Sequence, residues 1–147
     1  MKITKKSEYA LRALVQIALK DGEGVVRARD IAEKENMSVK FLEQVLALLK
    51  HRGIVETRRG VGGGYVLNHP AESISLAEII RLVDGPLAPV NCVSEMAYVP
   101  CGQNEKLCAL KSVMGEVRLA IIGVLERITV ADLCRRAVAL EAKYGKN

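Results

Sequence analysis

The sequence predicts a mainly α-helical protein with a β-hairpin wing, in which a winged helix-turn-helix is joined to a long dimerisation helix. Three observations support this fold class. Three helical patterns followed by two strand-like segments around a glycine run lie in the first half of the chain. A longer apolar helical pattern dominates the second half. All the excess positive charge lies in the first half.

The first three elements are helices. Residues 7–20 place apolar side chains at helical spacing, and residues 28–35 form a second, shorter helix with one apolar side. Ser38 is a suitable N-cap for a third helix, because its hydroxyl can accept from a free backbone N–H of the first turn. Gly53 ends that helix.

A β-hairpin follows the helices. Residues 54–58 and 65–67 are rich in β-branched and alternating residues, and the glycines of residues 60–64 form the turn between them. Residues 25–26 are a candidate short strand. Three helices and a hairpin in this order are typical of a winged helix-turn-helix.

Beyond Pro70 the chain returns to helix. Ser75 and Glu78 have the spacing of a capping box, which predicts a helix that ends near Gly85. Residues 86–105 hold three of the four prolines and are predicted to be irregular.

The last two elements are predicted to be helices. Residues 108–128 show i, i+3, i+4 apolar spacing and predict a helix roughly 30 Å long. Thr129 and Asp132 resemble a second capping box, which opens a final helix to about Tyr144. So long an apolar helix in so small a protein favours a dimer interface, although packing on the chain's own domain is the alternative.

These elements suggest four regions. Residues 1–69 form the winged helix, residues 70–85 a connecting helix, and residues 86–107 a loop that carries cysteines. Residues 108–147 hold the dimerisation helix and a C-terminal helix that packs on the winged helix.

The charge distribution indicates an anionic partner for the first half. The chain of 147 residues has a formal net charge of +5. Residues 1–69 hold 13 Lys and Arg against 8 Asp and Glu, whereas residues 70–147 hold nine of each. Nucleic acid is the commonest partner of such a basic region, and a solvated basic face is the alternative.

Several classes of protein are excluded. The apolar segments are too short to span a membrane, and the N-terminus lacks the apolar run of a signal peptide, so we expect a cytoplasmic location and no membrane partner. The glycine run lacks the following Lys-Ser/Thr of a nucleotide-binding loop. Because no nucleophile and base can be paired from the motifs, we do not expect an enzyme.

The third helix is the candidate DNA-reading element. In a helix-turn-helix the second helix of the pair enters the major groove and its N-terminal side chains reach the bases. The outward positions here include Lys40, Glu43 and Gln44. Lysine can meet guanine or phosphate, glutamate can accept from cytosine, and glutamine can pair with adenine.

Basic residues outside this helix are candidate backbone and minor-groove contacts. Arg58 and Arg59 stand at the hairpin tip, which suits a wing that enters a narrow minor groove. Lys2, Lys5 and Lys6 can hold phosphates.

Three cysteines have the spacing Cys92-x8-Cys101-x6-Cys108. In a reducing compartment such a group indicates metal or redox chemistry rather than disulfides, and thiolates on a flexible loop can bind iron. Alternatively, Cys108 simply begins the long helix. Cys134 shares a helical face with apolar residues and is predicted to be a core residue.

Two motifs and both ends of the chain carry a family resemblance. Residues 41–44, Phe-Leu-Glu-Gln, and residues 59–65, Arg-Gly-Val-Gly-Gly-Gly-Tyr, resemble the Rrf family of winged-helix transcriptional regulators, of the IscR, NsrR and CymR type. Residues 1–11 and 128–133 match as well. The resemblance implies a homodimer that binds a palindromic operator in double-stranded DNA. It places Ser38, Lys40, Glu43, Gln44 and Arg59 at DNA-contacting positions, with Lys40 where a small hydroxyl residue is found in some members.

The resemblance also implies a cofactor. Cluster-binding members place three cysteines in this region with shorter gaps, which here are Cys92, Cys101 and Cys108, and hold an iron–sulfur cluster (2Fe–2S or 4Fe–4S). One branch takes a fourth ligand at the position of Lys111, which cannot serve while protonated. Another takes an acidic residue of the first helix from the partner subunit, and Glu8 occupies that position.

Three functions therefore compete. The first is a transcriptional regulator whose operator binding is controlled by an iron–sulfur cluster that senses cluster supply, redox state or nitric oxide. The second is a cluster-free repressor of the same family that responds to thiol oxidation or a protein partner in sulfur metabolism. The third is a small electron-transfer iron–sulfur protein, which leaves the wing and the basic half without a role.

Overall fold

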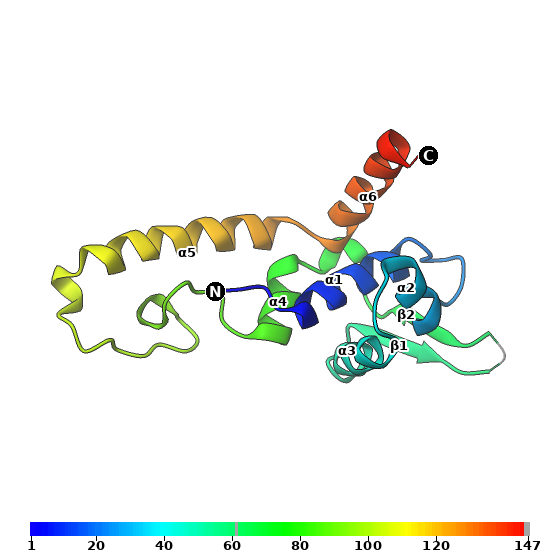
Figure 1. The fold of residues 1–147 in the computed structure, drawn as a ribbon, viewed down its shortest axis with the longest axis horizontal. Coiled ribbons are helices and arrows are strands. Elements are labelled where there is room, and N and C mark those ends of the chain that lie inside the picture. Colours follow the sequence, from blue (N-terminus) through cyan, green and yellow to red (C-terminus); the bar gives the residue numbers. More distant parts are fainter. Residues whose placement is uncertain (61, 146–147) are drawn as a thin grey trace.

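The computed structural model describes residues 1–60 and 62–145 and has the predicted mainly helical fold with a two-stranded hairpin (Figure 1). The winged helix forms one end of the molecule, and α5 extends from it to the other end. The elements in chain order are α1 (Lys5–Ala18), α2 (Ala28–Glu35), α3 (Val39–His51), β1 (Val55–Arg58), β2 (Gly64–Leu67), η1 (Ala71–Ser73), α4 (Leu76–Asp84), η2 (Asn91–Val93), η3 (Glu105–Leu107), α5 (Ala109–Arg127) and α6 (Val130–Tyr144).

Helix α1 starts two residues earlier than the apolar pattern predicted. Thr4 is its N-cap, and the Thr4 hydroxyl accepts from the backbone N–H of Ser7 at 3.3 Å. The Asp84 carboxylate at the end of α4 fixes this cap, because it accepts from the Thr4 N–H at 3.0 Å and from the Thr4 hydroxyl. A partner 80 residues away therefore sets the start of the helix.

The core of the winged helix is built around α1. Helix α1 contacts α2, α3, α4, α6 and β2. Fully buried side chains from these elements fill the interior; the largest include Leu14, Ile17, Ile31, Leu42, Leu46, Leu49, Ile79 and Val130. Leu14 of α1 and Val130 of α6 thus share one core although they are far apart in sequence, and their burial holds α6 against the winged helix.

The hairpin pairs β1 with β2 in antiparallel register, from Val55 opposite Leu67 to Arg58 opposite Gly64. The strand expected at residues 25–26 is reduced to a single bridge, between Val26 and Tyr65. This bridge brings the backbones so close that a Cβ on Gly64 would lie 2.6 Å from the Val26 carbonyl oxygen. Glycine is therefore required at the base of the wing.

The caps of the second half differ in completeness. Thr129 and Asp132 form a full capping box, as predicted. At Ser75 only half of the predicted box is found: the Ser75 hydroxyl accepts from the Glu78 N–H at 3.1 Å, and the described residues show no bond from the Ser75 N–H to the Glu78 carboxylate. The backbone on either side of Ser75 instead pairs with residues 128–130, through Leu76 N–H to Ile128 and Val130 N–H to Ile74.

The segment between α4 and α5 contains two short 3₁₀ turns, the second of which extends beyond residues 86–105, the part predicted to be irregular. Residues 86–108, here called the cysteine loop, include η2 and η3, and a third such turn, η1, follows Pro70. Each turn is three residues long and depends on local bonds, such as the Asn104 side chain accepting from the Lys106 N–H at 3.2 Å. Turns of this length have no apolar period, so periodicity could not reveal them.

Helix α5 has two different sides. Met114, Ile121 and Leu125 lie half-buried, and Ile122 and Leu125 pack on Leu87 and α4. The opposite side is exposed. None of the nineteen residues of α5 is fully buried. Along the described residues, no helix is long and apolar enough to cross a membrane.

We expect Gly64→Ala to destabilise the protein by roughly 1–3 kcal/mol, because the added methyl collides with backbone that cannot move without breaking the Val26–Tyr65 bridge. Thermal unfolding followed by circular dichroism measures the change. Gly123→Ala is the matched control: a Cβ there meets nothing within 4 Å, and alanine in a helix is favoured over glycine by up to about 1 kcal/mol. Equal melting temperatures for Gly64→Ala and the native chain would contradict this account.

Candidate nucleic-acid interface and cysteine loop

Helix α3 presents the predicted reading residues to solvent. Leu42, Val45, Leu46 and Leu49 anchor one side in the core. The other side is exposed at Lys40, Glu43 and Gln44, which lie at helical spacing along one stripe. Ser38 is the N-cap, as predicted, and its hydroxyl accepts from the Phe41 N–H at 3.3 Å.

Two residues outside the predicted set position the start of α3. The Tyr9 ring of α1 meets Phe41 edge-on, with ring centroids 5.1 Å apart, and the Tyr9 hydroxyl accepts from the Ser38 N–H at 3.4 Å. Asn36 ends α2 in the left-handed conformation (φ 52°), which turns the chain from α2 into α3. A tyrosine at helical spacing looks like any core residue, so no sequence signal points to the role of Tyr9.

The wing carries its two arginines in the open. Arg58 and Arg59 are both exposed, and among residues 1–60 and 62–145 the ion pair of Arg58 is a distant one with Glu56, at 3.9 Å. A Cβ on Gly63 would lie 2.5 Å from the Arg58 carbonyl oxygen, so the tight tip next to the arginines needs glycine. Val61, inside the predicted turn, lies outside the described residues.

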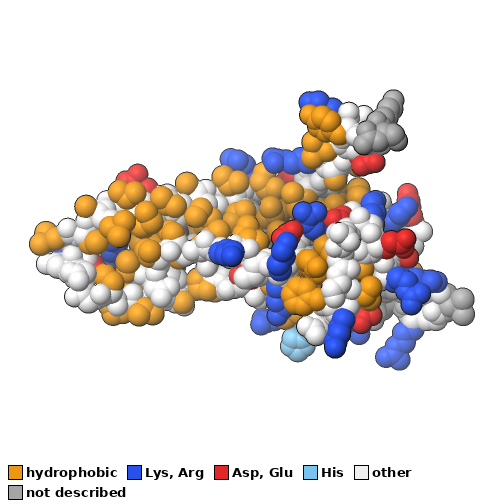
Figure 2. Space-filling view, in the orientation of Figure 1, with side chains coloured by type: hydrophobic (Ala, Val, Ile, Leu, Met, Phe, Trp, Pro, Cys, Tyr) orange, Lys and Arg blue, Asp and Glu red, His pale blue; other side chains and the backbone are white. Residues whose placement is uncertain are grey.

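Lys2, Lys5 and Lys6 are exposed on and before the first turn of α1. Lys5 and Lys6 lie one turn before Tyr9 and thus near the α3 start that Tyr9 contacts. Figure 2 shows Lys and Arg side chains gathered over the winged helix, whereas hydrophobic side chains dominate the visible surface along α5. The surface charge of the fold therefore follows the division seen in the sequence.

The three loop cysteines have different environments. Cys92 lies half-buried in η2, Cys101 is exposed, and Cys108 is the N-cap of α5, where its sulfur accepts from the Lys111 N–H at 3.3 Å. All are free thiols. Within residues 1–60 and 62–145, no three His, Cys, Asp or Glu side chains lie close enough together to hold a metal ion. The donors suit iron chemically, and the loop has to draw them together to bind it.

Lys111 is engaged by its neighbours. Its ammonium donates to the Glu105 carboxylate, and Glu105 also accepts from the Tyr98 hydroxyl at 2.7 Å. The bond to Glu105 raises the pKa of Lys111, so this side chain keeps its proton, the state in which it cannot bind a metal ion.

Glu8 is paired within its own helix. Its carboxylate oxygens lie 3.1 Å from the Lys5 ammonium and 3.3 Å from the Arg12 guanidinium. The hydrogen bond from Lys5 holds the pKa of Glu8 below its usual value, so the side chain is an anion. In the described part of the chain, Glu8 does not join the cysteines of its own copy in a ligand group.

Cys134 is a structural residue, as predicted. It lies half-buried against the main core, with its sulfur 3.8 Å from the Val15 carbonyl oxygen of α1. Burial raises the pKa of the Cys134 thiol, which makes it less reactive than an exposed thiol.

Comparison with known proteins identifies the family. The family model described as "Rrf2: Iron-dependent Transcriptional regulator" matches residues 3–136. The chain belongs to the Rrf2 family. This family membership, together with a winged helix whose reading helix is exposed, makes the chain a DNA-binding transcriptional regulator rather than an enzyme.

Rrf2 relatives match along almost their whole length. The chain is 35% identical to Protein rrf2 of Nitratidesulfovibrio vulgaris over 93% of this chain and 89% of that one. It is 33% identical to the regulator CymR of Bacillus subtilis, with 90% and 89% covered.

Solved Rrf2 structures show the same fold. The structure of CymR, "the Global Cysteine Regulator of B. subtilis", has a TM-score of 0.80 and 32% identity and covers 92% of this chain and 98% of CymR. The structure of IscR from T. potens has a TM-score of 0.73 and 31% identity, with 93% and 88% covered. Similarity of fold alone therefore does not separate a CymR-like regulator from an IscR-like one.

Proposed function

We propose that the chain is a homodimeric regulator that binds a palindromic operator in double-stranded DNA in the cytoplasm, and that an iron–sulfur cluster on Cys92, Cys101 and Cys108 controls the binding. The observation that carries the proposal is the placement of three free thiols on one irregular loop between α4 of the winged helix and the long helix α5. The loop joins the region that meets DNA to the region that meets the second copy.

The exposed side of α5 supports the homodimer. Five residues at alternating spacings of three and four form one stripe, called here the outer seam: Leu110, Val113, Val117, Ala120 and Val124. Leu110 is 63% exposed and Val113 is 52% exposed. This spacing is the a/d pattern by which two helices pack together, and a seam of this length is costly to leave in water.

The exposed stripe of α3 supports base reading. Lys40, Glu43 and Gln44 offer donors and acceptors to the major groove, and Ser38 stands at the exposed N-terminus of the same helix, an end of a helix that favours a phosphate. Arg59 and Arg58 serve the minor groove from the wing, and Lys2, Lys5 and Lys6 serve phosphates. Two copies related by a two-fold axis require two such half-sites, hence a palindrome.

The cysteine loop is coupled to the reading helix through α1. The loop begins directly after α4, and Asp84 at the end of α4 holds Thr4 at the start of α1. Tyr9, one turn further along α1, holds the start of α3. A change in the loop can therefore shift the position of α3 through contacts between described side chains.

The cysteines and Glu8 of the partner subunit are the proposed ligands. When bound, the cluster supplies reversible redox and ligand-loss chemistry. Thiolates suit iron, and the engagement of Lys111 with Glu105 leaves the fourth position to another group. The ionised Glu8 is such a group, provided that it leaves Lys5 and Arg12.

Thiol control without a cluster is the second candidate. It is favoured by the similarity to CymR, named as a global cysteine regulator, and by a similar structure described as the oxidized form of Staphylococcus aureus CymR, with a TM-score of 0.73 and 33% identity. Exposed Cys101 is the thiol that an oxidant meets first in this chain. The iron content of the protein distinguishes this candidate from the first.

We expect Val117→Glu to convert the dimer into a monomer, because a carboxylate in the outer seam stays unpaired when two helices meet. Sedimentation equilibrium measures the mass in solution. Leu119→Glu is the matched control, since Leu119 is 64% exposed on the same helix and lies outside the seam. A monomer with Leu119→Glu and a dimer with Val117→Glu would place the interface elsewhere.

We expect the Arg58→Ala/Arg59→Ala double variant to bind the DNA upstream of its own gene more weakly. Its salt dependence should also fall, by about one unit of slope for each phosphate that the arginines no longer neutralise. Gln44→Ala should instead relax discrimination at one base pair, by about 1–3 kcal/mol. Fluorescence anisotropy at several salt concentrations measures both effects.

Lys143→Ala is the control for the DNA measurements, because it removes a positive charge at the far end of α6. A loss of affinity as large as that of the wing variant would mean that net charge, rather than the wing, binds the DNA. An unchanged salt slope in the double variant would remove the wing from the interface.

Anaerobic purification should give a protein that contains iron and sulfide and absorbs visible light. Glu8→Ala should shorten the lifetime of this absorption in air, while Glu141→Ala, an acidic residue of α6, should leave it unchanged. No iron after reconstitution would overturn cluster control in favour of thiol control. A normal lifetime with Glu8→Ala would remove Glu8 as a ligand.

A further inference from the structure

Two positively charged side chains of α5 form ion pairs with the cysteine loop. Lys111 and Arg118 are seven residues apart, which is two turns, so they lie on the same side of the helix. Lys111 pairs with Glu105, and the Arg118 guanidinium lies 2.9 Å from the Glu95 carboxylate. Glu95 stands between Cys92 and Cys101, and Glu105 stands between Cys101 and Cys108. Each of the two loop segments between consecutive cysteines therefore has one ion pair with α5.

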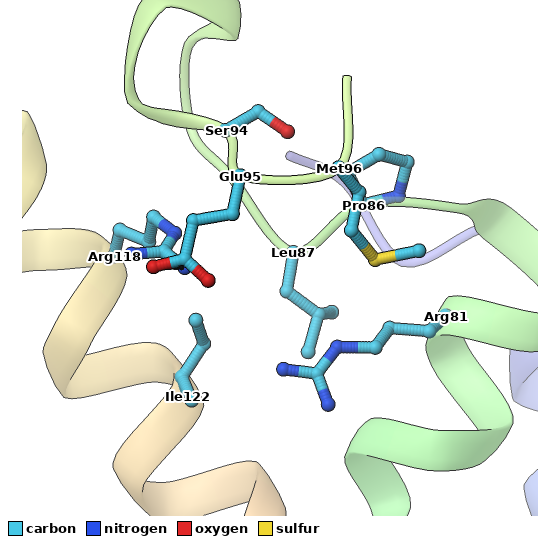
Figure 3. Close-up of a pocket in the computed structure, with 8 residues that line it drawn as sticks. All are labelled: Arg81, Pro86, Leu87, Ser94, Glu95, Met96, Arg118 and Ile122. Atoms are coloured by element: carbon cyan, nitrogen blue, oxygen red, sulfur yellow. Dashed lines mark ion pairs between the residues drawn. The ribbon is translucent and has the colours of Figure 1, made fainter. Parts of the chain in front are cut away.

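The Arg118 contact lies at a cavity between α4, the loop and α5. Figure 3 shows the Glu95 and Arg118 side chains directed toward each other above Ile122, with Leu87 and Arg81 on the other side of the cavity, whose volume is about 270 Å³. Arg118 is only 13% exposed, whereas Glu95 is 78% exposed. Removing the partner of a charge that is shielded from water costs more free energy than removing the partner of a surface charge. The Arg118 guanidinium therefore favours the position in which Glu95 stays paired with it.

The Lys111 contact is reinforced by an aromatic ring. Glu105 accepts from Tyr98 as well as from Lys111, and the Lys111 ammonium lies 5.7 Å from the centre of the Tyr98 ring. Tyr98 precedes Cys101 and Glu105 follows it, so this cluster closes the loop segment that contains Cys101. The backbone N–H of Lys111 also donates to the Cys108 sulfur, which links the cluster to the third thiol.

We propose that these ion pairs form a two-point clamp, made of Lys111 with Glu105 and Arg118 with Glu95, that positions the cysteine loop along α5 and leaves Cys101 at its free apex. The clamp rests on the proposed function, in which these cysteines are the controlling groups. It fixes the two flanking thiols against the helix in the metal-free protein. The loop therefore loses less conformational entropy when the thiols are drawn together by iron or by oxidation.

Alkylation of the reduced, metal-free, full-length protein tests the clamp. Iodoacetamide is added, and mass spectrometry of peptides gives a rate for each cysteine. We expect Glu95→Gln to raise the rate at half-buried Cys92 about fivefold, the change that corresponds to losing an ion pair worth about 1 kcal/mol. Glu105→Gln should raise the rate at Cys108 in the same way. Cys134, which lies half-buried against the core of the winged helix, should not change in either variant.

Charge exchange separates a positioning role from a general loosening of the fold. Arg118→Glu alone should raise the rate at Cys92, and Arg118→Glu combined with Glu95→Arg should return it toward the native value, because the pair is restored with the charges exchanged. Glu116→Gln, which removes a carboxylate from the exposed side of the same helix, should have no effect.

Unchanged rates at Cys92 and Cys108 in the two glutamine variants would overturn the clamp, as would a double variant that is no slower than Arg118→Glu. These outcomes are independent of the proposed function. A protein that binds iron but shows unchanged alkylation rates keeps cluster control and loses the clamp. A protein that binds no iron but shows the altered rates keeps the clamp and loses the cluster.

Discussion

The packing of α1 is the interaction on which the rest of the structure depends. One side of this helix lies in the core against α3, α4 and α6. Its ends and edges make the specific contacts: Thr4 with Asp84 before the cysteine loop, Tyr9 with Ser38 at the reading helix, and Val15 with Cys134 of α6. These contacts connect the DNA-facing surface, the loop and the C-terminal helix to one and the same helix.

Helix α5 extends this dependence beyond the single chain. Its inner side serves the loop and α4, through Arg118, Lys111 and the apolar contacts of Ile122 and Leu125. Its outer side is the apolar seam that stays uncovered in one copy. A helix with both tasks places the cysteine loop next to the surface that the second copy would cover. Assembly and sensing are therefore expected to influence each other in this Rrf2 regulator.

Local chemistry explains what the sequence could predict. The Ser38 cap, the Thr129–Asp132 box and the exposed positions of α3 follow from residues within one or two turns of each other, so capping motifs and apolar periodicity were enough to find them. The cap by Asp84, the support from Tyr9 and the Arg118–Glu95 pair join residues 23 to 80 positions apart, and no local pattern records them. On α5 the pattern predicted one broad apolar stripe. The fold divides this stripe into an inner and an outer side, because the cysteine loop and α4 pack on one side of the helix. No local sequence pattern specifies which side they cover.

The state of Glu8 links the two halves of the proposed mechanism. In this chain the Glu8 carboxylate is shared by Lys5 and Arg12, which lie on the helix that supports the reading surface, and Arg12 also pairs with Glu35. If Glu8 serves as a ligand to the partner's cysteines, Lys5 loses its Glu8 partner and becomes available to phosphates, whereas Arg12 keeps its ion pair with Glu35. Exposed pairs of this kind contribute little to stability, because water screens them, so Glu8 can be recruited at little cost. Ligation would thus free the Lys5 ammonium in the same step that joins the DNA-binding half to the loop of the second copy.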